Sequence, residues 1–369
     1  MRSHSPDYIF LSSVGILLIF GLVMLISASS VFSFQNYNGD SYGVIKHQLL
    51  HGIIPGLFLF FIFFKLINYK ILRKITPLLM LFAVILLILV FIPGLNTGGE
   101  TKSWLKIPGL FSFQPAEFMK IVFILFLALW FDKRGKRDIK NFWTGFLPFI
   151  FWLGLSAGLV ILQPDLGTAI IIIMSSLIIY FLAGAKKTHL FFIFLIGIAG
   201  FLIFMNFAQD YQKNRLSVFL NPQIDKLKTG YHINQAFLAI GSGGAFGVGF
   251  GQSRQKFAYL PEVIGDSIFA IISEELGFVI SVGFIILMIF IFLRGFQIAK
   301  KSRDTFAYLT VAGIISLFAI QSIVNIGAMV GIMPLTGVTL PFVSYGGSSI
   351  AMSLAATGII GNISRYTKK

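Results

Sequence analysis

Long apolar runs recur along the whole chain and constrain its fold more than any other feature. Ten runs each have roughly the 20 residues that a helix needs to cross about 30 Å of hydrocarbon. Because unpaired backbone polar groups are costly in lipid, continuous runs of this length predict helices rather than barrel strands. The sequence therefore predicts an all-α, polytopic membrane protein with ten transmembrane helices, at approximately 8–30, 46–66, 72–93, 115–131, 142–162, 166–183, 189–208, 267–293, 305–331 and 341–363.

The composition agrees with this class of fold. Of the 369 residues, 56% are hydrophobic and 12% are charged, which leaves too little polar surface for a soluble domain of this length. Cysteine is absent, so disulfides, thiolate catalysis and cysteine metal sites are excluded. Neither a second domain nor an internal repeat is visible, and we expect residues 1–369 to form one membrane domain.

The positive charges predict the orientation in the membrane. A net charge of +15 would suggest a nucleic-acid partner for a soluble protein, but here the lysines and arginines gather in short loops between apolar runs. With both ends placed inside, roughly two thirds of the 29 Lys and Arg fall on the cytoplasmic side. We therefore expect cytoplasmic termini, a place in the cytoplasmic membrane and no nucleic-acid partner.

Two extracytoplasmic loops are too long to be simple connectors, at about 94–114 and at 209–266 between the seventh and eighth helices. The second loop ends in Glu262 and Asp266 at the outer mouth of the eighth helix. A general base needs an ionised carboxylate in a partly dehydrated pocket, and this place provides one. Asp266 could equally be the N-terminal cap of the helix, and the residues alone leave both readings open.

Three acidic side chains fall within predicted spans, where an unpaired charge costs at least a few kcal/mol. They are Glu117, Glu274 and Glu275. Glu117 has a partner in Lys120, three residues later on the same helix face. This pair is either a structural ion pair or part of a ligand site beside a polar cavity.

Two glycine-rich segments have two readings each. GSGGAFGVGFGQSRQKF at 241–257 ends in Arg254 and Lys256 and either binds a phosphate or diphosphate or forms tight turns. LPFVSYGGSS at 340–349, which contains Ser344 and Ser348, either lets helices pack closely or contributes to a site. The five histidines show no coherent set of metal ligands.

Together these motifs resemble the SEDS family, the shape, elongation, division and sporulation proteins that include FtsW and RodA. The resemblance covers nearly the whole chain, and the GQSRQKF and GLVMLISAS motifs look more like FtsW than RodA. It rests on GLVMLISAS, on KSW followed by SFQPAEFMK, on QPDLGTA at 163–169, on AIGSGGAFGVGFGQSRQKF, on LPE with Asp266 and EELG, and on PLTG with LPFVSYGGSS.

The resemblance implies a peptidoglycan glycosyltransferase that polymerises lipid II during cell division, with a class B penicillin-binding transpeptidase and other membrane proteins of the division machinery as partners. It places the family's essential aspartate on Asp266, as the base for the acceptor hydroxyl while undecaprenyl diphosphate leaves. A divalent cation, Mg or Mn, could share the task. The substrate-binding candidates are Glu117, Lys120, Lys102, Trp104, Arg254, Lys256, Glu262, Ser344 and Ser348.

The chain also departs from the family's usual pattern. Members commonly read His-Thr-Asp-Phe at the catalytic position, whereas this chain reads Ile264-Gly265-Asp266-Ser267. An arginine that often precedes the loop tryptophan is Ser103 here. Asp266 would therefore have to act without an adjacent histidine. The alternative functions are a lipid II flippase, a RodA-type elongation polymerase and a non-catalytic scaffold.

Overall fold

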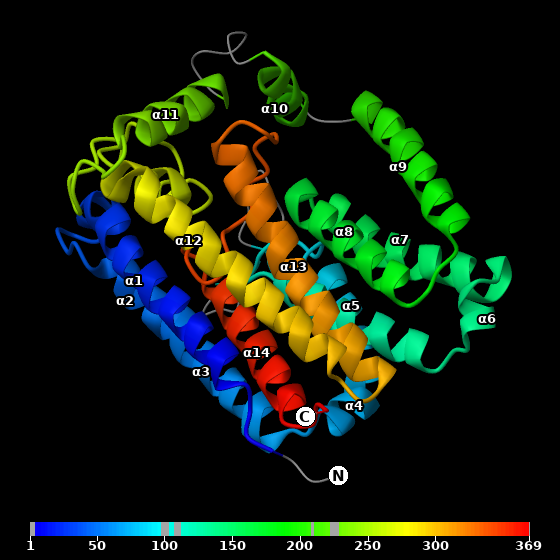
Figure 1. Ribbon diagram of the computed structural model, residues 1–369. Coiled ribbons are helices and arrows are strands. Elements are labelled where there is room, and N and C mark those ends of the chain that lie inside the picture. Colours follow the sequence, from blue (N-terminus) through cyan, green and yellow to red (C-terminus); the bar gives the residue numbers. More distant parts are fainter. Residues whose placement is uncertain (1–3, 97–102, 107–111, 208–209, 222–228, 369) are drawn as a thin grey trace.

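The computed structural model describes residues 4–96, 103–106, 112–207, 210–221 and 229–368. Its helices pack side by side in one bundle, and the N and C termini lie together at one end (Figure 1). The backbone N–H of His4 donates to the carbonyl of Arg365 at 2.9 Å. The two ends of the chain therefore lie on the same side of the bundle, as the charge pattern predicts.

Helices account for most of the described chain. They are α1 (Tyr8–Asn36), α2 (Gly43–Gln48), η1 (Leu49–Ile53), α3 (Ile54–Phe61), η2 (Ile62–Leu66), α4 (Tyr69–Leu89), α5 (Pro115–Asp132), α6 (Lys136–Ile139), η3 (Phe142–Phe146), α7 (Leu147–Ile161), α8 (Leu166–Leu182), α9 (Lys187–Phe207), α10 (Asp210–Leu220), α11 (Thr229–Ser242), α12 (Ile268–Lys300), α13 (Thr305–Met329) and α14 (Gly347–Ser364).

All ten apolar runs contain helix, and among the described residues six helices are long and apolar enough to cross a membrane. The six include the continuous helix 43–66, built from α2, η1, α3 and η2, and the helix 142–161, built from η3 and α7. The chain is therefore a multi-pass membrane protein. The number of ten spans stays a prediction, because the remaining helices are shorter, more polar or more charged.

The expectation of an all-α chain is wrong in one detail. Two short antiparallel strands, β1 (Leu105–Lys106) and β2 (Ser112–Phe113), pair in the loop before α5, with Leu105 opposite Phe113. Pairing satisfies backbone groups of a loop that folds back against the bundle. The region 209–266 is also more ordered than a loop, because α10 and α11 lie within it.

The last helix begins later than expected, at Gly347 rather than near residue 341. Phe342 has a φ of 65°, in the left-handed region, and this conformation interrupts a helix there. The segment before α14 instead forms a loop that bonds to the loop before α12, where Tyr345 N–H donates to the Ile264 carbonyl. Gly347 itself lies close to the second apolar run, since a Cβ at this position would be 2.9 Å from the carbonyl oxygen of His51. This supports the close-packing reading of the 340–349 segment.

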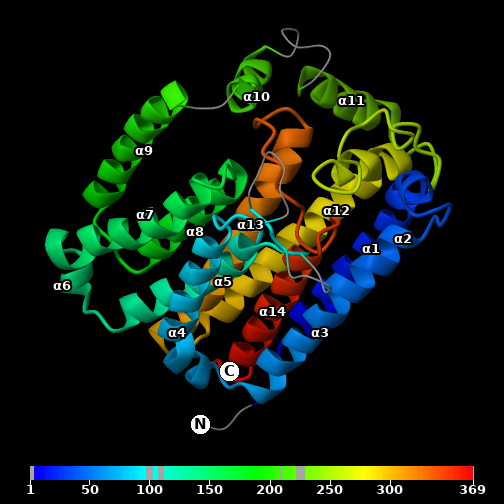
Figure 2. The same cartoon turned by 180° about the vertical axis from the view of Figure 1, so that it is seen from behind.

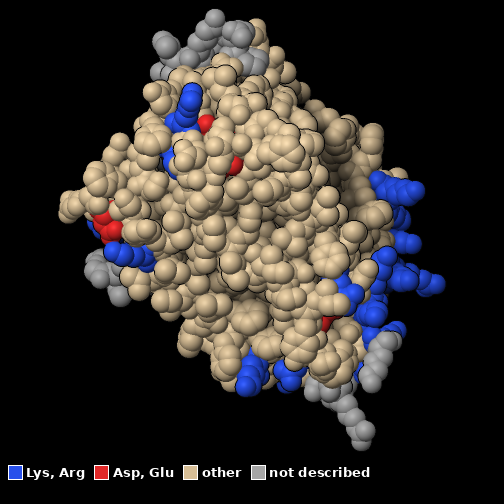
Figure 3. Space-filling model, turned by 60° about the vertical axis from the view of Figure 1, so that its left-hand side comes forward, with Lys and Arg blue, Asp and Glu red and all other residues tan. Residues whose placement is uncertain are grey.

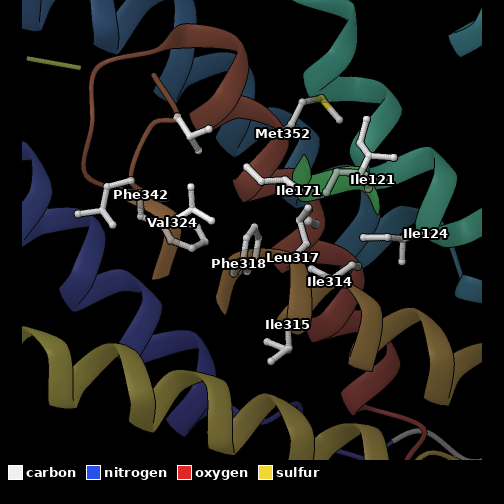
Figure 4. Close-up of a cluster of buried hydrophobic side chains, with 14 of the residues drawn as sticks. Ile121, Ile124, Ile171, Ile314, Ile315, Leu317, Phe318, Val324, Phe342 and Met352 are labelled. Carbon is white, nitrogen blue, oxygen red and sulfur yellow. The ribbon is translucent and has the colours of Figure 1, made fainter. Parts of the chain in front are cut away.

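Helix α13 forms the centre of the bundle. In Figure 4 Leu317 and Phe318 of α13 share one apolar cluster with Ile121 of α5 and Ile171 of α8. Gly313 permits this approach, because a Cβ there would lie 2.7 Å from side-chain atoms of α5 and α8. Seen from behind, α1–α3 lie on one flank of this centre and α7–α9 on the other (Figure 2). The packed centre gives the half of α13 that carries Gln321 and Asn325 a rigid base.

Charged side chains are distributed unevenly over the surface. In Figure 3 most Lys and Arg side chains gather along the edge next to the termini, and the broad middle of the molecule is almost free of charge on this face. An uncharged belt suits contact with lipid, and a cationic edge suits the cytoplasmic side. The opposite end carries α10, α11 and the loop that leads to α12.

Candidate functional site

The glycine-rich segment is joined to a break in α12. Gly277 has a φ of 75°, and there the chain turns so that Val248 N–H donates to the Glu274 carbonyl at 3.0 Å. A Cβ on Gly277 would lie 2.2 Å from the backbone nitrogen of Gly247, so two backbones meet where only glycine fits. This supports the reading of tight turns, and it fixes the segment to the helix that follows Asp266.

A buried salt bridge reinforces this junction. The Lys256 ammonium lies 3.1 Å from Glu275 Oε1, and both side chains are less than 5% exposed. It also donates to the Gly251 carbonyl at 2.7 Å, while Ser27 of α1 donates to Glu275 at 2.7 Å. Glu274 accepts from the Ser253 hydroxyl and from the Arg254 backbone N–H. Both intramembrane glutamates therefore have partners, which explains how this part of α12 tolerates them.

The loop that carries Asp266 is held by neighbouring segments. The Ser344 hydroxyl donates to the Gly265 carbonyl at 2.6 Å, and Tyr345 N–H donates to the Ile264 carbonyl at 2.8 Å. Asn325 of α13 donates to the backbone carbonyl of Asp266 at 2.8 Å. Ser344 thus acts through the backbone of this loop, and the segment before α14 and helix α13 together hold the backbone around Asp266.

Asp266 faces a cavity of about 860 Å³ at the end of the bundle that carries α10 and α11. Asp266 is only 9% exposed. Two smaller recesses of about 330 and 380 Å³ adjoin the cavity, and Trp104 and Thr339 line all three. The polar and aromatic lining of the main cavity includes Tyr37, Trp104, Arg215, His232, Glu262, Asp266, Thr339 and Tyr345.

The titratable groups of the cavity perturb one another. Burial raises the pKa of Asp266 to about 6, although the positive charge of Arg215 and hydrogen bonds from Ser267 oppose the rise. Burial and the charge of Asp266 also raise the pKa of Glu262. Burial lowers the pKa of His232 to about 4, so its imidazole is neutral at pH 7. An aspartate in this setting is ionised near neutral pH yet still a better base than one in water.

The cap reading for Asp266 is wrong. The N-cap residue of α12 is Ser267, and the helix begins at Ile268. Asp266 lies one residue earlier and lines the cavity. The other reading that the sequence left open, Asp266 as a general base, stays a prediction.

The predicted pair of Glu117 and Lys120 forms an ion pair of 2.8 Å, buried in α5. The ammonium also donates to Gln321 of α13 at 3.1 Å, and Gln321 donates to the Thr339 carbonyl at 2.8 Å. Thr339 lines the cavity and bonds to Ser349 at 3.0 Å through its hydroxyl. The ion pair is confirmed, and a polar path joins it to the cavity wall. Its role in ligand binding stays a prediction.

The remaining candidates lie in different places. Trp104 and Glu262 line the cavity. Ser348 accepts a hydrogen bond from the Gln114 backbone at the start of α5. Of the described cations, Arg254 is exposed and Lys256 is buried in its salt bridge, and the structure places neither on the cavity wall. Lys102 lies outside the described residues.

Sequence reasoning missed Arg215 and His232, which α10 and α11 bring to Asp266. Arg215 was counted only as a positive charge, and His232 was considered only as a metal ligand. A search for all titratable residues within region 209–266 would have found both. Within the part of the chain that the structure describes, no group of three or more His, Asp or Glu residues is placed to hold a metal. The described residues therefore show no such site for the Mg or Mn ion that the resemblance suggests.

A family model described as "Cell cycle protein", for FtsW, RodA and SpoVE, matches residues 8–369. The chain belongs to this family. It is 42% identical to "Stage V sporulation protein E" of Bacillus subtilis, over all of this chain and 99% of the relative. It is 40% identical to "Probable peptidoglycan glycosyltransferase FtsW" of Trichlorobacter lovleyi, over all of this chain and 95% of the relative.

Solved structures share the fold over almost the whole chain. One, described as "Structural coordination of polymerization and crosslinking by a peptidoglycan synthase complex", matches with a TM-score of 0.78, 26% identity and 98% coverage of both chains. The rod shape determining protein RodA of Thermus thermophilus matches with a TM-score of 0.71, 25% identity and the same coverage. The predicted SEDS membership and the place in the cytoplasmic membrane are both confirmed.

Proposed function

We propose that this chain is a peptidoglycan glycosyltransferase that polymerises lipid II into glycan strands, with Asp266 as the general base. The observation that carries the proposal is the buried carboxylate of Asp266 in a large polar cavity that also contains Arg215. The relatives named as peptidoglycan glycosyltransferases, which align over the full chain, give this cavity its substrate class.

In the proposed reaction, Asp266 takes the proton from the acceptor sugar hydroxyl as that oxygen attacks the anomeric carbon of the lipid-linked donor. The bond from this carbon to the diphosphate oxygen breaks, and the electron pair leaves with undecaprenyl diphosphate. Arg215 lines the same cavity and supplies positive charge for the leaving group. In this proposal Arg215 has the role for which the resemblance suggested Arg254 and Lys256.

The pKa of Asp266 gives the reaction a pH dependence with a definite sign. The base must be unprotonated, so the rate is high above the pKa and falls as the pH drops through about 6. The Glu117–Lys120 pair acts behind the wall, through Gln321 and Thr339, rather than by direct contact with the reacting atoms.

The test is lipid II polymerisation by the purified chain together with a class B transpeptidase partner. Asp266→Asn keeps the shape of the side chain but removes the base, and we expect the rate to fall about 10²- to 10⁴-fold. Glu262→Gln is the matched control, a second carboxylate of the same cavity, and we expect a smaller loss. Normal polymerisation by Asp266→Asn would contradict the proposal. Lipid II translocation without polymerisation would favour the flippase.

We further propose a membrane topology of ten spans with both termini in the cytoplasm and region 209–266 outside. The absence of native cysteine makes this testable with single-cysteine variants. Arg254→Cys is expected to react with a membrane-impermeant maleimide added outside intact cells, and Lys301→Cys only after lysis. Reaction of both residues from the same side would overturn the topology.

The role in division, with division-machinery partners, is also a proposal. The identity to a sporulation protein and to an FtsW protein is similar, at 42% and 40%. The motif likeness to FtsW favours division over the elongation role of RodA. Rescue of a strain depleted of FtsW, but not of one depleted of RodA, is the expected result.

A further inference from the structure

Helix α11 brings a histidine to the residue that follows Asp266. The Nε2 atom of His232 lies 2.6 Å from the Ser267 hydroxyl oxygen. The same oxygen is 2.8 Å from the Pro261 carbonyl and 3.4 Å from Asp266 Oδ1. One hydroxyl group therefore has an imidazole, a carbonyl and a carboxylate around it.

The number of available protons determines which way these bonds run. A serine hydroxyl has one proton to donate, and the carbonyl of Pro261 and the ionised Asp266 can only accept. If Ser267 donated to His232, neither oxygen would receive a proton. The arrangement is satisfied when the neutral imidazole donates from Nε2 and leaves the hydroxyl proton to the two loop oxygens. Burial keeps the pKa of His232 low, at about 4, so the neutral form dominates.

We propose that His232 is a positioning residue for the catalytic carboxylate: by donating to Ser267, it directs the Ser267 hydroxyl proton toward Pro261 and Asp266. This inference rests on the proposed function, because it assigns the aspartate that His232 serves. The hydroxyl proton turns to Asp266 while the carboxylate is ionised and to Pro261 once Asp266 has taken the acceptor proton. Region 209–266 thereby supplies, from α11, a histidine that the sequence next to Asp266 lacks.

The charges that face this group come from two elements. Arg215 projects from α10 into the same cavity, and Glu262 and Asp266 belong to the loop before α12. The hydroxyls of Tyr37 and Tyr345 also belong to the lining. Because His232 is neutral at pH 7, its replacement by an apolar side chain removes no charge from this set. A changed pH dependence in such a variant would come from the lost hydrogen-bond chain.

The experiment is the pH profile of kcat/KM for lipid II polymerisation, measured with the full-length chain and its transpeptidase partner. His232→Leu and Ser267→Ala are each expected to raise the pKa of the acidic limb by about one unit, a tenfold change in the ionisation constant. His232→Gln keeps a donor of similar reach and is expected to remain near the unsubstituted protein. The double variant is expected to match Ser267→Ala alone, since both changes break one chain.

The opposing outcomes are equally definite. A uniform loss of rate at every pH in His232→Leu, with an unmoved acidic limb, would mean a purely structural role and would overturn the inference. A Gln variant with the shifted limb of the Leu variant would also overturn it, because donation would then not matter. If His232→Leu fails to fold, Ser267→Ala and His232→Gln still decide the question. None of these outcomes bears on the proposed function itself, which activity in Asp266→Asn would contradict.

Discussion

Two buried lysine–glutamate pairs, one in α5 and one between the glycine-rich segment and α12, have the same chemistry but different surroundings. The Glu117–Lys120 pair spans three residues of one helix, at 2.8 Å. The Lys256–Glu275 pair joins a loop to a helix across 19 residues of sequence, at 3.1 Å. The first is a local contact, and the second closes a long turn.

The neighbours of the two pairs differ as well. Lys120 donates to Gln321, and Gln321 donates to the carbonyl of Thr339 on the cavity wall. Lys256 is surrounded by the Gly251 carbonyl and the Ser27 hydroxyl, and its bonds end inside the protein. We infer that the pair in α5 adjusts the polarity of the cavity, whereas the pair at α12 holds the segment that precedes Asp266. Single substitutions in each pair separate these two roles.

The largest effect is expected at the loop junction. Glu275→Leu leaves the Lys256 ammonium buried without its counter-charge, and loss of one partner of a buried pair costs about 3–5 kcal/mol. We expect a large drop in the unfolding temperature in detergent, with loss of polymerisation in the same samples. The control is Lys46→Met, which removes the exposed pair with Asp40 and should leave the unfolding temperature unchanged.

Stability retained in Glu275→Leu would show that the junction does not depend on this pair. A second variant, Lys256→Met with Glu275→Leu, removes both charges together. Since replacement of a whole buried pair by apolar residues is often close to neutral, it should regain much of the lost stability.

A smaller effect on stability is expected from Glu117→Gln. The amide can still accept a hydrogen bond from Lys120, so the cost is about 1–3 kcal/mol for a weakened charged contact. We expect the protein to stay folded at the assay temperature but to polymerise lipid II more slowly, because the path to Thr339 is disturbed. Equal losses of rate and stability in this variant and in Glu275→Leu would remove the distinction between the two pairs.

The same contrast explains how much the sequence could predict. The Glu117–Lys120 pair was predictable because residues three apart on a helix must lie close together, and the apolar runs were predictable because the lipid solvent demands them. Asp266 was placed at the mouth of a span for the same reason. These are statements about neighbours in sequence or about average environment.

The features that the sequence did not reveal depend on contacts between distant residues. Lys256 was read as a free cation because its partner lies beyond a turn whose path depends on close backbone contact at Gly247 and Gly277. Arg215 and His232 reach Asp266 only because α10 and α11 fold back over the cavity. Their positions follow from the packing of the whole outer region, which no local pattern encodes.

The smallest effect is expected from the loss of one hydroxyl, either Thr339 in the network of the α5 pair or Ser253 at the junction with α12. Thr339→Val removes a hydroxyl that bonds to Ser349 at 3.0 Å, while Gln321 keeps the Thr339 backbone carbonyl, so the cost is about 1 kcal/mol. Ser253→Ala removes a bond to the charged Glu274, and the cost is about 1.5–3 kcal/mol.

Thermal unfolding in detergent should therefore rank Ser253→Ala as the less stable variant. Polymerisation rates of the folded proteins should show the reverse order, because Thr339 lines the cavity and Ser253 is buried at the junction. If the two measurements ranked the variants alike, both hydroxyls would be structural, and the α5 network would have no separate influence on the site.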